Sequence, residues 1–378
     1  MLNLAISFGC SFFTILLIVR SENIHARFTL DLDLDGVQKN HAYAVPRVGG
    51  AGIACGAIVV ALIEWLWLKT QATDFAMLLL CAIPAFGSGI VEDLTKRVSA
   101  KVRLSSALLS ALAGASLINA VVLRVDLPLF DQVLHVWPLA IGITMLGVAG
   151  LTNAINIIDG FNGLAAIVSL AIFASIGYVA YQVSDVLIMS ISLTMVGALS
   201  GFVIWNYPVP SIFLGDGGAY LVGFTIAESL LLLIARHPGV SAWYAIVVVI
   251  YPVTETLFSI YRRTIVRGRA ADEPDGLHLH TLIYRRIVGK GLDSESLRQR
   301  TRRNSRTSIY LWILNFIAVI PATFLWNTRL PLAVTMLVFI ICYVWLYCLI
   351  VRFKAPRWLL LFGRDAVVVA TKVEQTRN

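Results

Sequence analysis

The sequence is poor in charged residues. Asp, Glu, Lys and Arg make up only 14% of its 378 residues, whereas an average soluble domain has about 25%. Hydrophobic residues make up 58%, and a water-soluble protein of this size could not bury that much apolar surface. The composition therefore excludes a soluble enzyme, a coiled coil and a disordered chain. We expect an all-α polytopic membrane protein, because apolar runs of about 20 residues have the length of helical spans.

Cysteine is also scarce, and none of the five cysteines belongs to a C-x-x-C pair or has a His-rich partner. This pattern indicates neither a disulfide framework nor a zinc site. All five lie in apolar runs, at Cys10, Cys55, Cys81, Cys342 and Cys348. We interpret them as small core residues.

The apolar runs predict eleven transmembrane helices. Their ranges are 2–19, 48–68, 75–92, 104–123, 134–152, 163–181, 186–204, 217–235, 239–260, 308–326 and 330–351. No basic residue precedes the first run and no small-residue cleavage site follows it, which favours a first span over a removable signal peptide. No internal repeat or low-complexity linker divides the chain, so we expect residues 1–378 to form a single membrane domain.

The basic residues indicate the orientation of these spans. With the N-terminus outside, 26 Lys and Arg fall in inside segments and 4 in outside segments. This excess agrees with the positive-inside rule, so the net charge of +8 is a topology signal and no nucleic-acid partner is expected. The longest inside segment is then a basic loop at 261–307, followed by the last two spans and a cytoplasmic tail at 308–378.

Polar residues cluster at the predicted inside ends of the spans. The clusters are PRVGG at 46–50, GIVEDLTKRVSAKVR at 89–103, TNAINIIDGFNGLA at 152–165, WNYPVPSIFLGDGG at 205–218 and DGLHLHTLIYRR at 275–286. Polar groups at membrane depth are costly unless they line a watery site. Because all five clusters share one side of the membrane, they predict one cytoplasmic active site.

Three residues of the third cluster share a helical face. Asn153, Asn156 and Asp159 are each three residues apart, which brings them to one side of a helix end. Gly160 and Gly163 then allow close backbone approach. A single asparagine in a span often only bonds to a neighbouring helix, but three polar residues in register favour a ligand site.

Asp216, in FLGDGG, has two interpretations. It could cap the helix that follows, because Asp is a preferred N-cap residue. It could instead hold a phosphate-bound Mg²⁺, which takes one or two protein oxygens and completes its octahedron with water and phosphate. The glycines around Asp216 suit the second interpretation, because they let a phosphate-bound metal approach the backbone.

Two further pairs carry charge at the inside ends. Glu92 and Asp93 are adjacent acids followed by basic residues, which could simply mark an inside boundary, although a buried carboxylate stays ionised only near cations. His278 and His280 lie in the predicted loop, where exposed histidines ordinarily have no function. Above a site that handles a diphosphate, however, they could donate charge-assisted hydrogen bonds to phosphate oxygens.

In this order, NAINIIDGFNGLA, FLGDGG and the His-x-His sequence resemble the polyprenyl-phosphate N-acetylhexosamine-1-phosphate transferases, the WecA/MraY-type glycosyltransferase 4 family. The motif core covers about residues 40–290, and its HLH loop is closer to the WecA branch. The resemblance implies ten or eleven transmembrane helices with a cytoplasmic cleft. We expect a bacterial inner membrane, in which the distribution of basic residues predicts a periplasmic N-terminus and a cytoplasmic C-terminus. The resemblance also implies UDP-N-acetylhexosamine as donor, undecaprenyl phosphate in the lipid bilayer as acceptor, and Mg²⁺ or Mn²⁺ as cofactor.

Carried over to this sequence, the resemblance assigns metal coordination to Asp216 and Asn156, and catalytic roles to Asp93, Glu92 and Asp159. The residues expected to bind substrate are Arg47, Lys101, Arg103, Asn153, Asn156, Asn162, His278 and His280. Two positions depart from the family pattern. Glu92 replaces the first aspartate of an Asp-Asp pair and keeps its charge, whereas Asn162 replaces an aspartate and cannot act as a base.

The implied reaction is phosphoryl transfer that yields undecaprenyl-diphospho-sugar and UMP. A phosphate monoester is largely dianionic at neutral pH, so direct attack on the sugar-linked phosphorus needs no strong base; a covalent aspartyl intermediate is the alternative. GlcNAc is the default sugar, with FucNAc or QuiNAc as alternatives, and the product would initiate O-antigen or another surface polysaccharide. A transporter or flippase of an anionic lipid or nucleotide would instead distribute polar groups across both membrane faces.

Overall fold

The structure is a computed structural model that describes residues 1–30, 44–68, 72–268, 276–288 and 296–352. The predicted tail after residue 352 and two parts of the predicted basic loop lie outside the described residues. Within the described part of the chain there is no β-strand, only an isolated bridge between Leu30 and Pro46. The expected all-α fold is confirmed, and all five cysteines are free thiols.

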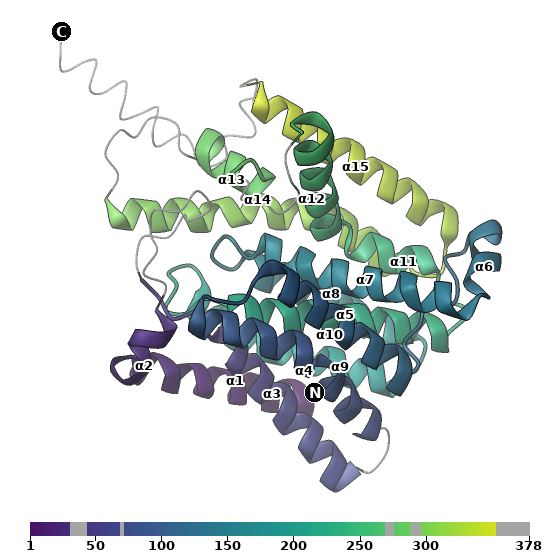
Figure 1. Ribbon diagram of the computed structural model, residues 1–378, viewed down its shortest axis with the longest axis horizontal. Helices are drawn as coiled ribbons and strands as arrows, with labels where there is room; N and C mark the ends of the chain where they lie inside the picture. The colour runs from purple at the N-terminus through teal and green to yellow at the C-terminus, as the bar shows by residue number, and fades with distance from the viewer. Residues whose placement is uncertain (31–43, 69–71, 269–275, 289–295, 353–378) are drawn as a thin grey trace.

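Fifteen α-helices make up the described structure. They are α1 (Leu2–Arg20), α2 (Glu22–Thr29), α3 (Gly49–Ile63), α4 (Ala72–Thr95), α5 (Ala100–Leu117), α6 (Pro128–Leu134), α7 (Trp137–Ile158), α8 (Leu164–Gln182), α9 (Val186–Asn206), α10 (Gly215–Arg236), α11 (Ala242–Val248), α12 (Ile250–Tyr261), α13 (Leu279–Ile283), α14 (Leu297–Phe324) and α15 (Arg329–Val351). Short π-helical segments continue three of them, at Glu64–Leu68, Arg262–Val266 and Tyr284–Val288. The long helices run side by side, while α12 is turned across their direction (Figure 1).

The eleven predicted spans all coincide with described helices, although not all of these helices are apolar enough to count as spans by length and composition alone. Nine of them are long and apolar enough to cross a membrane, and a tenth results if α11 and α12, bent by 71° relative to each other, form one broken span. The remaining predicted span, 104–123, corresponds to α5, which packs against α4 and α7. Helix α5 contains Lys101, Arg103 and four serines, which lower its mean hydropathy.

The predicted basic loop at 261–307 is largely helical where the structure describes it. Helix α14 begins at Leu297, eleven residues before the predicted span, because Ser296 and Gln299 form a capping box at its start. The Ser296 backbone N–H donates to the Gln299 side chain at 2.9 Å. Helix α13 lies between this extension and α12 along the chain. The prediction of an open loop over the site is therefore wrong for these residues.

Helix α10 lies at the centre of the bundle and packs against α3, α4, α7 and α8. Its first turn approaches α3 and α4 so closely that only glycine fits at the contacts. A Cβ atom on Gly50 would collide with the backbone of Gly218, and one on Gly89 would lie 2.5 Å from the nitrogen of Gly217. These glycines let three helix backbones meet at one end of the bundle, where the polar sequence clusters also lie.

Candidate active site

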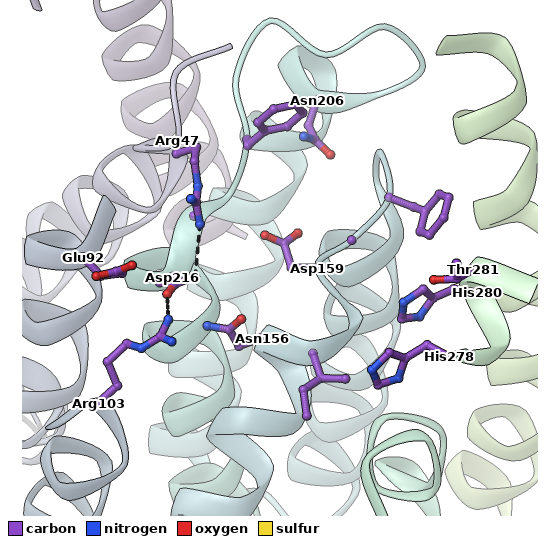
Figure 2. A pocket seen from close by; sticks show the side chains of 15 residues that line it. Arg47, Glu92, Arg103, Asn156, Asp159, Asn206, Asp216, His278, His280 and Thr281 are labelled. Carbon is purple, nitrogen blue, oxygen red and sulfur yellow. Dashed lines mark hydrogen bonds and ion pairs between the residues drawn. The ribbon is translucent and has the colours of Figure 1, made fainter. Parts of the chain in front are cut away.

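The five polar clusters of the sequence line one pocket of about 330 Å³. Figure 2 shows its side chains. Its lining residues are Arg47, Glu92, Arg103, Asn156, Ile157, Asp159, Gly160, Phe161, Asn206, Phe213, Gly215, Asp216, His278, His280 and Thr281. These distant segments therefore meet around one pocket.

Backbone pairing places the segment around Arg47 beside the start of α10. The N–H of Phe213 donates to the carbonyl of Pro46 at 2.8 Å, and the N–H of Gly49 donates back to Phe213 at 2.9 Å. Arg47 therefore reaches the carboxylate of Asp216, with an Nη2–Oδ1 distance of 3.4 Å. A loop before α3 thus supplies a cation to a site built on α10.

Asp216 lies in the first turn of α10, with its carboxylate between two guanidinium groups (Figure 2). Arg103 pairs with one carboxylate oxygen and Arg47 with the other. Its side chain makes no capping hydrogen bond to the helix. The helix-cap interpretation of Asp216 is therefore wrong, and its carboxylate belongs to the pocket.

Asp93 performs the capping that the sequence suggested for Asp216. Its two carboxylate oxygens accept the backbone N–H groups of Asp216 at 2.8 Å and of Gly217 at 2.9 Å. The side chain is fully buried and is not part of the pocket wall. Its neighbour Glu92 does line the pocket, and it also accepts the N–H of Val98 at 2.6 Å. The two adjacent acids therefore occupy different places.

Asn156 and Asp159 come from the inner end of α7, where Asp159 follows the last helical residue. Asp159 points into the space between Arg47 and the two histidines (Figure 2). Burial raises the pKa of the Asp159 carboxyl well above its ordinary value, and the Asp93 carboxylate raises it further, against the opposing effect of Arg47. The Nδ2 atom of Asn156 is buried without a hydrogen-bond partner in the described part of the chain. Both groups are thus poised for a partner in the pocket.

The oxygens of the pocket suit a divalent cation that brings its own phosphate ligands. Asp216, Asp159 and the amide of Asn156 offer carboxylate and carbonyl oxygens, which Mg²⁺ prefers. No group of three or more His, Cys, Asp or Glu in the described ranges could enclose a metal alone. A Mg²⁺ ion here would take one or two protein carboxylates and complete its shell with water and phosphate.

His278 and His280 form the wall opposite Asp216. They were expected in an exposed loop, but both are buried at the start of helix α13, and their rings stack at 5.0 Å between centroids and 9° between planes. The Nδ1 atom of His278 bonds to Glu255 of α12 at 3.0 Å. Phe161 packs on the His280 ring at 5.4 Å. The histidines are therefore held in place from two sides.

Three residues predicted to bind substrate do not line the pocket. Asn153 donates to the carbonyl of Ala149 at 2.8 Å and accepts from Tyr220 at 3.3 Å, so it links α7 to α10. Lys101 is exposed at the surface. Neither residue, nor Asn162, is part of the pocket wall, so their role in substrate binding stays a prediction.

Asn162 instead fastens the turn after α7 to α14. Its backbone N–H donates to the Asn304 side chain at 2.8 Å, and its carbonyl accepts from Ser308 at 2.7 Å. The side chain of Asn162 is 2% exposed. Asn162 therefore has a structural role in this turn, because the backbone groups of a buried turn need hydrogen-bond partners.

Several pocket residues were not predicted. Asn206 closes the neighbouring turn, accepting the N–H of Gly163 at 2.6 Å and donating to the carbonyl of Ile212 at 2.8 Å. Phe161 and Asn206 lie within the polar clusters, so their motif membership was an available signal. Glu255, which lies behind the pocket wall and bonds to His278, gave no such signal, because it is in a separate segment 23 residues before that histidine.

The fold and the site define a polytopic membrane protein with a charged pocket suited to phosphate groups at one end of a helix bundle. The sequence profile of glycosyl transferase family 4 matches residues 75–234. A probable undecaprenyl-phosphate N-acetylglucosaminyl 1-phosphate transferase of Bacillus subtilis (strain 168) is 30% identical over 286 residues, covering 74% of this chain and 77% of the relative. The chain belongs to glycosyl transferase family 4.

Two other similar proteins come from Thermotoga maritima and Latilactobacillus sakei subsp. sakei. The undecaprenyl-phosphate alpha-N-acetylglucosaminyl 1-phosphate transferase of Thermotoga maritima is 28% identical over 70% of this chain and 77% of its own length. A phospho-N-acetylmuramoyl-pentapeptide-transferase of Latilactobacillus sakei subsp. sakei is also 28% identical, over 50% of this chain and 61% of its own length.

Proposed function

We propose that the protein transfers N-acetylhexosamine 1-phosphate, by default GlcNAc 1-phosphate, from a UDP-sugar to undecaprenyl phosphate and releases UMP. The observation that carries this proposal is the arrangement of the pocket. Asp216 lies between two guanidinium groups on one side, and Asp159 with two histidines lies on the other. Cations and acids together suit a donor diphosphate with its metal ion. The relatives' names supply the substrate class.

In the proposed donor site, oxygen ligands would bind the metal ion and cationic side chains would bind the phosphates. Asp216 and the amide oxygen of Asn156 would hold Mg²⁺, or Mn²⁺ in its place, and the bound ion would neutralise charge on the diphosphate. Arg47, Arg103 and His278 would donate hydrogen bonds to phosphate oxygens. Phosphoryl transfer depends mainly on such positioning and charge stabilisation.

The proposed chemical step is direct attack by the lipid phosphate. One of its oxygens forms a bond to the sugar-linked phosphorus, while the bond from that phosphorus to the UMP oxygen breaks. The lipid phosphate is largely dianionic at neutral pH, so no protein base has to remove a proton. In this step Asp159, which lines the pocket, would lie beside the reacting groups without serving as a nucleophile.

A second cavity supports a polyprenyl acceptor. It is an apolar groove of about 620 Å³ between residues 121–125, which follow α5, and helices α7, α10, α11 and α12. Ala154 lines this groove, while Asn156 and Ile157, within the next turn of α7, line the polar pocket. A lipid chain in the groove would gain about 25 cal/mol for each Å² of apolar surface it buries. The phosphate at its end would then lie near the donor.

The distribution of polar groups favours this enzyme over a transporter or flippase. At the opposite end of the bundle, Asp185 is paired with Arg236 at 2.9 Å and with His237 at 2.7 Å. These three side chains pair with one another, whereas the polar residues at the pocket end surround a cavity. We also propose the bacterial inner membrane, a periplasmic N-terminus and initiation of O-antigen or a similar polysaccharide, which the 26-to-4 distribution of basic residues supports for orientation.

The test is incubation of the purified protein with undecaprenyl phosphate, Mg²⁺ and separate UDP-sugars. UDP-GlcNAc, UDP-QuiNAc, UDP-FucNAc and UDP-glucose form a suitable panel. We expect UMP and a lipid-linked diphospho-sugar with one N-acetylated sugar, and no reaction without the lipid phosphate. Release of UDP would indicate transfer of the sugar alone and would overturn the proposal, as would the absence of product with every donor.

A further inference from the structure

Glu255 is a buried carboxylate that the proposed chemistry does not use directly. It lies in α12 at 1% exposure and is not part of the pocket wall. It is also outside residues 75–234, which match the family profile. A carboxylate inside a membrane bundle is costly unless its oxygens are satisfied, so its partners indicate why it is there.

Three donors from two other parts of the chain converge on Glu255. Its Oε1 atom accepts from the Nδ1 atom of His278 and the backbone N–H of Leu279, both at 3.0 Å. Its Oε2 atom accepts from the hydroxyl of Tyr343 in α15 at 2.9 Å. Glu255 therefore joins α12 and α15 to the start of α13, which carries the histidine wall of the pocket.

These bonds decide which nitrogen of His278 serves the pocket. Because Nδ1 donates to Glu255, Nε2 is the ring nitrogen left for a ligand, and it can donate to a phosphate oxygen when the ring carries both protons. The stacked His280 ring limits rotation of the imidazole. Arg262 holds the preceding backbone through the carbonyl of Leu277, and it also binds the hydroxyl of Tyr347 at 2.6 Å. The ring is thus fixed in direction before a substrate arrives.

We propose that Glu255 is a positioning residue that, with Tyr343, fixes the ring of His278 so that Nε2 faces the donor diphosphate. This inference rests on the proposed function for the identity of that ligand. A preorganised donor is most effective where charge develops in the transition state. Orientation of His278 should therefore affect kcat more than the KM for the UDP-sugar.

The test compares Glu255→Gln with Glu228→Gln in purified protein. Gln keeps the size of the side chain and an acceptor for Leu279 but removes the charge. Glu228 is a matched control, because it is fully buried in α10, outside the pocket wall, and its oxygens have no hydrogen-bond partner among the described residues. We expect Glu255→Gln to lower kcat for UMP release by about 10–100-fold, as residues behind a functional histidine commonly do. Glu228→Gln should leave kcat nearly unchanged.

A double-mutant cycle separates positioning from a merely structural role. If Glu255 acts through His278, Glu255→Gln should cause almost no further loss in a His278→Ala background. Tyr343→Phe should lower kcat in the same direction by a smaller factor, and Glu255→Asp should restore part of the activity. A folded Glu255→Gln protein with wild-type kcat, or an equal loss with and without His278, would overturn the proposal. If Glu255→Gln does not fold, the Tyr343→Phe and His278→Ala pair gives the same comparison.

Histidine ¹⁵N NMR tests the geometry without turnover. The chain has six histidines, and a His278→Gln variant identifies the signals of His278. We expect a proton on Nδ1 in the wild type and its redistribution in Glu255→Gln. A wild-type His278 protonated only on Nε2 would overturn the positioning proposal even if UMP is released. Conversely, wild-type protein that releases no UMP but shows the Nδ1 proton would overturn the proposed function alone.

Discussion

Asp93 accepts the backbone N–H of Asp216 at 2.8 Å, so the acid at the end of α4 holds the residue that presents its carboxylate to the pocket. The second oxygen of Asp93 accepts from Gly217 at 2.9 Å. Two N–H groups at the start of α10, which lack partners within the helix, are satisfied by this one side chain. The position of Asp216 therefore depends on a residue that does not itself line the cavity.

This relationship predicts unequal effects for the acidic pair. Asp93→Asn removes the charge and places an amide group against one of the two N–H donors, so Asp216 should shift and turnover should fall. Glu92→Gln keeps its acceptor for Val98 and should lower turnover less. The measurement is kcat for UMP release together with the melting temperature of each variant. A larger loss for Glu92→Gln would show that the pocket-facing acid of the pair matters more than the buried one.

Sequence reasoning located the site well because polar residues are rare and costly at span ends. Arg47, Glu92, Arg103, Asn156, Asp159 and Asp216, from four separate motifs, line one pocket with the histidines of a fifth. It did not assign partners, since side-chain spacing along one helix cannot indicate which residue of another helix donates to it. Asp93 and Asp216 are 123 residues apart, and either could have been the cap.

Other differences have local physical reasons. The first residues of α14 were not predicted to be helical, because they contain several arginines and no apolar run. Ser296 and Gln299 nevertheless carry the sequence pattern of a capping box. Helix α5 met the expectation for a span in length but not in hydropathy. Asn162 was assigned to substrate because it lies in a motif, whereas buried turns also need polar side chains to satisfy their backbone.

The apolar groove predicts a substitution that should affect the lipid acceptor alone. Gly147 lines the groove, and a Cβ there would meet no atom within 4 Å, so Gly147→Leu should fill the groove without a clash. We expect a several-fold rise in the KM for undecaprenyl phosphate and little change for a short-chain prenyl phosphate. Gly142→Leu is the control, since Gly142 has equal space in α7 but does not line the groove. Equal effects of the two variants would remove the groove as the acceptor site.

A buried acid outside the spans predicts a pH-dependent loss of stability. Burial alone would raise the pKa of Asp126, but the N–H of Ala242, the hydroxyl of Ser241 and the Arg124 guanidinium together hold it below its ordinary value. Asp126 accepts from Ser241 at 2.9 Å and from Ala242 at 2.8 Å. Because the folded pKa is lowered, this stabilisation is present above the unfolded pKa of about 3.9 and is lost as pH falls through the folded pKa.

Asp126→Asn should therefore lower the melting temperature at pH 7, and the difference from wild type should shrink below about pH 4. The measurement is thermal unfolding in detergent between pH 3 and pH 7, with the exposed Asp74→Asn as control. A gap between Asp126→Asn and wild type that does not depend on pH would contradict the assigned ion pairs.

The proposed orientation predicts which single cysteines react in intact cells. In a cysteine-free background, Ser99→Cys at the pocket end should resist a membrane-impermeant thiol reagent until the cells are permeabilised. Ser184→Cys, at the opposite end after α8, should react without permeabilisation. Both serines are exposed, whereas Ser241 at that end is buried against Asp126 and would be a poor probe. Labelling of Ser99→Cys in intact cells would reverse the orientation and place the pocket outside.

Asp216→Asn tests whether this carboxylate serves the donor diphosphate. The helix start is held by Asp93, so the variant should fold, as judged by size-exclusion and thermal unfolding in detergent. Loss of the charge should weaken stabilisation of the metal and diphosphate by several kcal/mol, and about 1.4 kcal/mol is tenfold in rate. We therefore expect UMP release at least about a hundredfold slower, with little rescue by added Mg²⁺.

Asp185→Asn provides the contrasting control, because Asp185 is a true N-cap that accepts the N–H of Ile188 at 3.1 Å at the far end of the bundle. Its replacement should lower the melting temperature but leave kcat almost unchanged, since no pocket residue contacts it. Asp185→Asn thus measures the effect of a lost helix cap on stability, whereas Asp216→Asn measures the effect of a lost pocket charge on kcat. A folded Asp216→Asn protein with near wild-type UMP release would mean that the donor diphosphate is bound elsewhere.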